Sequence, residues 1–393
     1  MKMIFMDHTS GMPVDSNVVE AMIPYFNTLY GNPSSLHSFA LEAKKGLKKA
    51  RENVANLVNA DKNGKIIFTS GATESNNWAI RGIAVRNKER GKHIITTSIE
   101  HMSVINVCKY LMQQGFKVTF LPVDKYGIVD LGALERKLTE ETILVSVMYA
   151  NGEIGTIEPI HEISKIVHAR NSYLHVDATA AIGQISIDVQ KEGIDLLTIS
   201  SNDIYGPKGV GALYIRKGTR LAPFVLGGGQ EQGLRSGTEN LPGIVGMGKA
   251  AELAKTEMKT ESKRLSKLRD QFINKLLQSI RYSFLNGHPK KRLPNNVAIR
   301  FNFIEGESML LNLNIAGVAA SSGSACTAKT LEPSHVLRAI GLKHEEAHGS
   351  LLFTLGKQNT EEDVNYVVKL LPDIVKRLRA MSPLTPRELR ESV

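Results

Sequence analysis

"IIFTSGATESNNWAIRG", residues 66–82, carries the pattern that decides the architecture of this chain. The apolar run at its start passes through Gly71 into a stretch with helical character, so it predicts a strand, a tight turn and a helix. Free amides at such a helix start favour an anion, and Thr73 adds a hydroxyl group beside them. The stretch therefore predicts a phosphate site, although a strand-to-helix turn capped by Ser or Thr is the commoner meaning of this pattern.

The same alternation of strand and helix continues along the chain. Between most of the apolar runs lies a segment long enough for a helix, which predicts an α/β fold with a mostly parallel seven-stranded sheet covered on both faces. The predicted strands are 65–70, 93–98, 117–123, 143–150, 173–178, 196–200 and 211–216.

The pattern changes near residue 250. A charged helix is predicted at about 247–281, the apolar segment "NNVAIRFNF" follows, and an amphipathic helix is predicted at 361–380. We therefore expect a large domain over 15–250, with the cofactor site and the dimer interface. Residues 1–14 and 251–393 are expected to form a smaller α+β domain.

Composition excludes several classes of protein. The 393 residues are 42% hydrophobic and 22% charged, as in a soluble globular protein. No run approaches the roughly 18 apolar residues of a membrane span. The net charge of +10 is spread over ordinary amphipathic sequence, so we expect no nucleic-acid partner. Only two cysteines, and a first segment without a signal-peptide pattern, predict a reducing cytoplasm.

Three further side chains are candidates for chemistry. Asp177 ends an apolar strand, where a carboxylate can pair with a protonated ring nitrogen or cap the next helix. His101 follows another strand, so it is expected at the same sheet edge, where it could stack on a ring or be an ordinary buried histidine. Cys326 stands among Ser, Gly and Ala, which suits a nucleophile or metal ligand better than a structural thiol.

Taken together, these segments resemble the cysteine desulfurases of the IscS/NifS group, which are pyridoxal phosphate (PLP) enzymes of fold type I. The resemblance spans nearly the whole chain and rests on several motifs in order. They are "YGNPSSLHSFA", "FTSGATESNN", "EIGTIEPI", "HVDAT", "YGPKGVGALYIRKG", "GGGQEQGLRSGTEN" and "SSGSACTAKTLEPSHVLRAIGL".

The resemblance implies a homodimer with PLP at the subunit interface and a mobile loop cysteine that receives sulfur from free cysteine. By motif, Cys326 matches that cysteine, Asp177 the partner of the pyridine nitrogen and His101 the histidine stacked on the ring. The positions that match the phosphate site are Ala72, Thr73, Ser200 and, from across the dimer, Thr238.

The chain departs from the family pattern at the site itself. Where the family has His-Lys before Tyr-Gly-Pro-Lys-Gly, this chain has Asn202 and Asp203, and a carboxylate cannot form a Schiff base. We expect the charge of Asp203 to oppose the cofactor's phosphate and phenolate. Lys208, beyond the Gly-Pro turn, is not expected to substitute. The other departures are Gly152 and Ala180, near the phenolate oxygen, and Leu352 in place of the arginine that clamps the substrate carboxylate.

These observations leave three hypotheses. The leading one is an iron–sulfur assembly protein with weak or lost desulfurase activity. It docks an IscU-like scaffold and offers Cys326 as persulfide carrier or as ligand of a cluster, [2Fe-2S], whose other ligands come from the scaffold. The alternative is an active desulfurase, which converts L-cysteine to L-alanine and an enzyme persulfide with non-covalently bound PLP. The third is a structural paralogue that binds nothing small.

Overall fold

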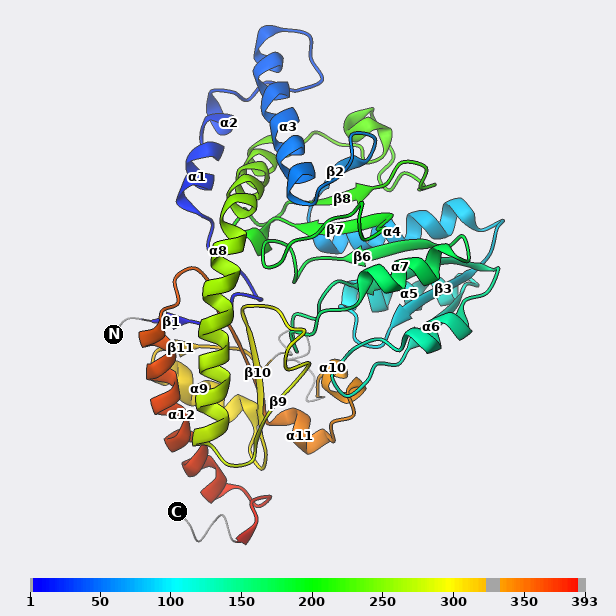
Figure 1. Cartoon of the computed structure of the whole chain (residues 1–393). Coiled ribbons are helices and arrows are strands. Elements are labelled where there is room, and N and C mark those ends of the chain that lie inside the picture. Colours follow the sequence, from blue (N-terminus) through cyan, green and yellow to red (C-terminus); the bar gives the residue numbers. More distant parts are fainter. Residues whose placement is uncertain (1–2, 323–332, 388–393) are drawn as a thin grey trace.

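The large sheet is the frame on which the rest of the chain is assembled (Figure 1). The structure is a computed structural model that describes residues 3–322 and 333–387. Seven strands form the sheet in the order β2-β8-β7-β6-β5-β3-β4, and β8 alone runs antiparallel to its neighbours. The strands are β2 (Lys65–Thr69), β3 (His93–Thr97), β4 (Lys117–Leu121), β5 (Thr142–Met148), β6 (Tyr173–Asp177), β7 (Leu196–Ser200) and β8 (Gly211–Ile215). The mostly parallel seven-stranded sheet predicted from the sequence is confirmed.

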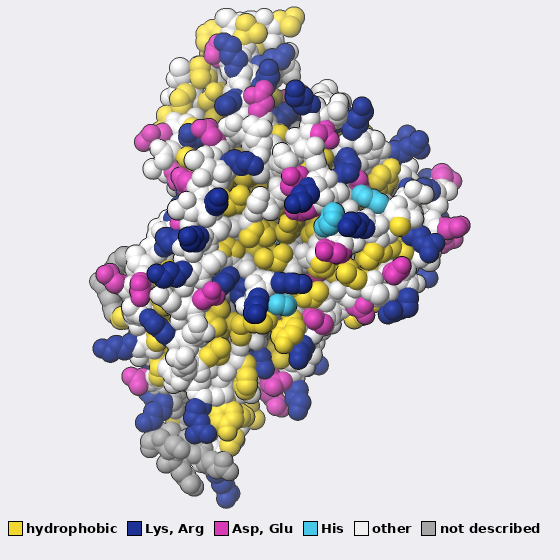
Figure 2. Space-filling model, in the orientation of Figure 1, with side chains coloured by type: hydrophobic (Ala, Val, Ile, Leu, Met, Phe, Trp, Pro, Cys, Tyr) yellow, Lys and Arg dark blue, Asp and Glu magenta, His cyan; other side chains and the backbone are white. Residues whose placement is uncertain are grey.

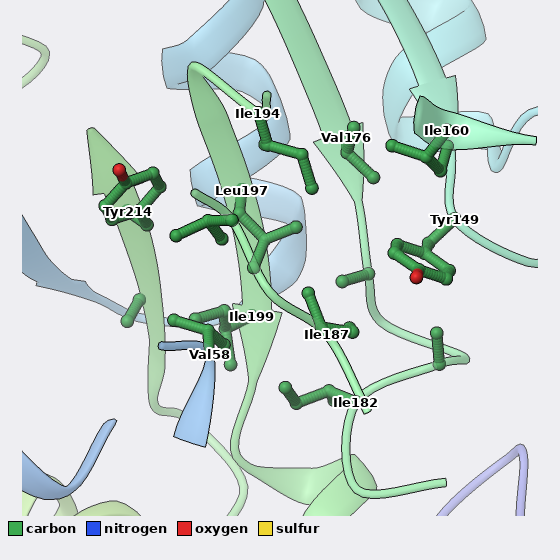
Figure 3. Close-up of a cluster of buried hydrophobic side chains, with 14 of the residues drawn as sticks. Val58, Tyr149, Ile160, Val176, Ile182, Ile187, Ile194, Leu197, Ile199 and Tyr214 are labelled. Atoms are coloured by element: carbon green, nitrogen blue, oxygen red, sulfur yellow. The ribbon is translucent and has the colours of Figure 1, made fainter. Parts of the chain in front are cut away.

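Helices cover both faces of this sheet because its strands alternate apolar side chains between two clusters. In β2, Ile66 and Phe68 belong to one hydrophobic cluster and Ile67 to the other. Helices α4 (Ala72–Asn87) and α5 (Met102–Gln113) pack on the Ile67 side. The opposite cluster, part of which Figure 3 shows around Leu197 and Ile199, is covered by α3 (Ser38–Leu57), α6 (Leu131–Lys137) and α7 (Ile160–His168).

A third hydrophobic cluster lies outside the large sheet. Its strands are β9 (Ser283–Leu285), β10 (Asn296–Phe301) and β12 (Ser350–Thr354), which form an antiparallel sheet in the order β12-β10-β9. A short parallel pair joins β1 (Ile4–Phe5) to β11 (Val318–Ala319). Helices α9 (Gly306–Ile315) and α12 (Glu361–Met381) pack in this cluster, whereas α10 (His335–Ala339) and α11 (His344–His348) form a smaller cluster with Ile99, Met148 and Ile154.

One long helix, α8 (Leu241–Ser279), joins the two parts (Figure 1). Its first turns place Ile244 and Met247 in the cluster of the large sheet, whereas Leu268 and Phe272 belong to the cluster around β10 and β12. Near its start lie α1 (Ser16–Met22) and α2 (Pro24–Asn27). Among the described residues, no helix is long and apolar enough to cross a membrane.

Candidate functional site

The predicted phosphate turn lies where β2 ends and α4 begins. Gly71 precedes the first helical residue with φ of 150°, and a Cβ atom added there would meet nothing within 4 Å. Ala72 and the exposed Thr73 open the helix, whose first amides have no carbonyl within the helix to bind. Open space in front of a 16-residue helix start is the geometry that an anion needs.

Asp177 lies at the carboxyl end of β6 and is nearly fully buried. Its Oδ1 accepts hydrogen bonds from the Thr179 amide at 3.0 Å and the Thr179 hydroxyl at 2.5 Å, and its Oδ2 accepts from Asn76 Nδ2 at 2.7 Å. An ionised carboxylate has about four acceptor positions. These three bonds therefore leave about one position, on Oδ2, which suits one further N–H donor such as a protonated ring nitrogen.

His101 caps the N-terminus of α5 and its ring is exposed. Its Nδ1 accepts from the Ser103 amide at 3.2 Å and lies 2.7 Å from the Ser103 hydroxyl oxygen. That hydroxyl oxygen also accepts from Asn76 Nδ2 at 2.9 Å. The structure thus brings His101 and Asp177 together through two residues that sequence reasoning missed. The available signal was spacing, because Asn76 lies one helical turn after Ala72 in the same motif.

Asp203 lies in the turn Asn202–Ile204 that follows β7. Burial raises the pKa of this carboxyl from 3.8 to about 7, a hydrogen bond with Ser200 lowers it, and the nearby charge of Asp177 raises it further. Ser200, the last residue of β7, is buried. Asn202 Oδ1 is buried without a hydrogen-bond partner among the described residues. Two carboxyl groups thus share one polar region, and Asp203 changes its charge near neutral pH.

Two of the departures from the family pattern are neighbours in space. A Cβ atom added at Gly152 would lie 3.5 Å from the Ala180 side chain and 3.3 Å from Thr9 Cγ2. The added Cβ atom would thus already be in contact with both neighbours, so the surrounding residues pack closely around Gly152. Since Gly152 and Ala180 are small and apolar, neither side chain can donate a hydrogen bond to a phenolate oxygen there.

Leu352 lies in the middle of β12 and is buried. Its backbone amide donates to Ser321 O at 2.7 Å. Leu352 also lines a small cavity, together with Glu153 and Ser350. Burial raises the pKa of Glu153 to about 8, although the Ser334 hydroxyl donates to its Oε2 at 2.8 Å. This cavity therefore contains no guanidinium from residue 352 to bind a carboxylate.

The segment that carries Thr238 is fixed to the phosphate turn by an ion pair. Arg235 Nε donates to Glu74 Oε1 at 2.9 Å, and Glu74 lies in the first turn of α4. Thr238 itself is exposed, so it is available to a second molecule. Cys326 lies outside the described residues.

Known proteins match this chain over nearly its whole length. The aminotransferase class-V family matches residues 4–367. Cysteine desulfurase IscS 1 of Archaeoglobus fulgidus is 60% identical over 385 residues, which cover 98% of this chain and 100% of that protein. Cysteine desulfurase IscS of Methanosarcina thermophila is 53% identical over 389 residues, 99% of this chain and 96% of that protein.

The solved structures include one titled as a NifS-like protein. It superposes with a TM-score of 0.89 at 39% identity and covers 96% of this chain and all of that chain. The architecture is thus the α/β fold type I of PLP-dependent enzymes, and PLP is the cofactor of this family. The open space at Gly71 and the acceptor position left on Asp177 Oδ2 are compatible with its phosphate and its ring nitrogen. The chain belongs to the cysteine desulfurases of the IscS/NifS group, within the aminotransferase class-V family.

Proposed function

We propose that this protein is a cysteine desulfurase of iron–sulfur cluster assembly that binds PLP without a covalent lysine link. The observation that carries the proposal is the intact set of groups around α4 and Asp177, which can hold the cofactor although Asp203 stands where a lysine is expected. The relatives are named as cysteine desulfurases, which favours an active enzyme over our expectation of weak or lost activity.

The residues of this chain would divide the work as follows. The α4 amides and Thr73 hold the phosphate, and the free position on Asp177 Oδ2 holds the ring nitrogen in its protonated form. Bound there, PLP supplies an electron sink for the amino acid. Because the pKa of Asp203 is about 7, part of its population is uncharged at neutral pH, which weakens the repulsion expected from the sequence. Cys326 would accept the sulfur as a persulfide.

The test is L-alanine release from L-cysteine, with and without added PLP. The native protein is expected to form alanine only with PLP, and Asn202→His/Asp203→Lys is expected to form it faster because the variant regains an amine. Cys326→Ser is the control for the sulfur acceptor and should abolish persulfide formation. No alanine from the native protein with saturating PLP, together with alanine from the double variant, would refute the proposal.

A second candidate role, which the replacement of the lysine by Asp203 favours, is that Cys326 serves as cluster ligand or persulfide carrier on an IscU-like scaffold. The other cysteine of the chain, Cys108, is not suited to bind iron. It is fully buried, and burial raises the pKa of its thiol to about 12, so it stays protonated. It cannot supply a second ligand, so the remaining ligands of a [2Fe-2S] cluster would come from the scaffold. Anaerobic copurification tests this role. Cys326→Ser should lose the cluster and Cys108→Ser should retain it, whereas equal retention would exclude Cys326 as a ligand.

We also propose a homodimer in a cytoplasmic setting. Figure 2 shows hydrophobic side chains at the top of the molecule, and the exposed apolar residues of the α1–α3 region include Ile23, Phe26 and Leu36, which is 99% exposed. Exposed apolar surface of this kind favours association with another protein surface. Phe26→Glu should shift sedimentation from dimer toward monomer, and Leu311→Glu on α9 is a matched exposed control. A native protein that sediments as a monomer would contradict this proposal.

A further inference from the structure

The starting point is a chain of hydrogen bonds whose direction the geometry fixes. Asn76 Nδ2 lies 2.7 Å from Asp177 Oδ2 and 2.9 Å from Ser103 Oγ. The Asp177 carboxylate accepts only, so the nitrogen of the Asn76 amide must face it. The two N–H bonds of that nitrogen are therefore both used, one on the carboxylate and one on the Ser103 hydroxyl oxygen.

The hydroxyl group of Ser103 has two acceptor positions on its oxygen and one hydrogen, so the bond from Asn76 alone leaves the direction of its contact with His101 open. It accepts from Asn76, and His101 Nδ1 lies 2.7 Å from its oxygen. The Ser103 amide also points at Nδ1, at 3.2 Å, and a backbone amide can only donate. The amide therefore requires an Nδ1 without a hydrogen, so the neutral ring carries its proton on Nε2 and the Ser103 hydroxyl group donates to Nδ1 as well.

The buried position of Asn76 adds to this argument. Its side chain is fully buried, and its Oδ1 has no hydrogen-bond partner among the described residues. A buried oxygen without a hydrogen-bond partner destabilises a fold. If residue 76 served only to fill space, an apolar side chain of similar size would therefore give a more stable protein. The two donors of the amide account for an asparagine at this position.

We propose that Asn76 is a positioning residue that orients the Asp177 carboxylate and, by donating to the Ser103 hydroxyl oxygen, reinforces the Nε2–H tautomer of His101 that the Ser103 amide also favours. One buried amide thereby acts on both the acceptor offered to the ring nitrogen and the donor offered by the exposed histidine ring. The role of these two groups toward PLP rests on the proposed function, whereas the tautomer of His101 is a property of the chain without any cofactor.

The first test is NMR of the cofactor-free protein with ¹⁵N-labelled histidine, with the His101 signals assigned from His101→Gln. The native ring should carry its proton on Nε2. In Asn76→Leu, Ser103 is free to turn its hydroxyl away from Nδ1, so the ratio of Nδ1–H to Nε2–H tautomer should rise by about fivefold. Asn77→Leu is the matched control, because Asn77 Nδ2 donates to Thr73 O and has no part in the chain of bonds. It should leave the His101 ratio unchanged.

A second pair of variants keeps the test decisive if Asn76→Leu fails to fold. Ser103→Ala removes the hydroxyl group but leaves Asn76 on Asp177, and it should raise the Nδ1–H share. Ser103→Thr keeps the hydroxyl group and should restore the native ratio. A native His101 with its proton on Nδ1, or equal ratios in the native protein and both Ser103 variants, would overturn the proposal.

PLP titration of the cofactor-free protein, followed by absorbance, tests the other arm. Asn76→Leu should raise the dissociation constant about tenfold, because Asp177 loses a donor to a charged oxygen, and Asn77→Leu should leave it unchanged. An equal constant in native protein and Asn76→Leu would remove the role toward Asp177. Neither readout requires turnover, so a protein that forms no alanine but shows both effects refutes the proposed function and leaves this inference standing.

Discussion

Replacing Asp203 by asparagine should stabilise the protein in a way that grows with pH. The pKa of this carboxyl is raised from 3.8 to about 7, so the folded chain binds its proton more tightly than the unfolded chain. The contribution of the protonated group is fully present below pH 3.8 and is lost as the pH rises to about 7. An asparagine has no proton to lose, so the difference between the two proteins increases over this range.

The size of the effect follows from the same values. Between pH 5 and pH 8 the free energy of unfolding of the native protein should fall, relative to Asp203→Asn, by at most about 2.7 kcal/mol. Asp203 is only partly enclosed by surface area, so solvent stabilises part of its charge. We therefore expect a measured difference of about 1–2 kcal/mol.

The assay is urea unfolding of the cofactor-free proteins at pH 5 and pH 8, at one fixed protein concentration because of association. Other buried acids, such as Glu100 and Glu158, have raised pKa values too, but they are present in both proteins and cancel in the comparison. Asp373→Asn, on the exposed face of α12, is the control. A stabilisation by Asp203→Asn that is equal at both pH values would refute the reasoning.

Two further predictions concern β2 and the turn that follows it. Arg51→Met should lower the free energy of unfolding by about 3–5 kcal/mol, because it leaves the buried Glu231 carboxylate without the guanidinium that lies 2.7 Å away. The control is Lys48→Met, which removes an exposed ion pair and should change the free energy of unfolding by less than about 1 kcal/mol in the same urea titration. Gly211→Ala should weaken PLP binding in an absorbance titration, because the added Cβ atom would lie 2.7 Å from Gly71 Cα and push the turn aside, whereas unchanged PLP binding would mean that the turn can shift freely.

The sheet was predictable because its strands are buried on both faces and therefore appear as continuous apolar runs. All seven predicted runs contain a strand, and their ends differ by a residue or two, as at β4, which ends at Leu121 rather than at residue 123. The first residue of α8 was harder to predict from the sequence. The charge pattern indicated a helix from about 247, but the helix begins at Leu241, where Asn240 caps it and Pro242 occupies the first turn. Its first turns are apolar because they pack on the large sheet, so they lack the charges that marked the remainder.

The site was predictable only where single residues carry the chemistry. Asp177 and His101 stood at strand ends in the sequence, and the structure connects them through the Asn76 amide, which donates to Asp177 directly and reaches His101 through the Ser103 hydroxyl group. Asn76 gave only the weak signal of its spacing from Ala72, because an asparagine on a helix usually faces solvent or bonds within its own turn. The neutral-range pKa of Asp203 was also hidden, since it arises from burial and from a carboxylate 26 positions earlier in the chain.

The continuity of α8 has a mechanical consequence. Its 39 residues form a rod of about 58 Å that belongs to the cores of both parts of the molecule. The glycines of its first turns offer no point of flexure, because Gly248 packs against Ala50 of α3 and Gly246 against Met22. The two parts are therefore held in a fixed relative orientation by α8. They cannot rotate apart as rigid bodies unless this helix bends or breaks.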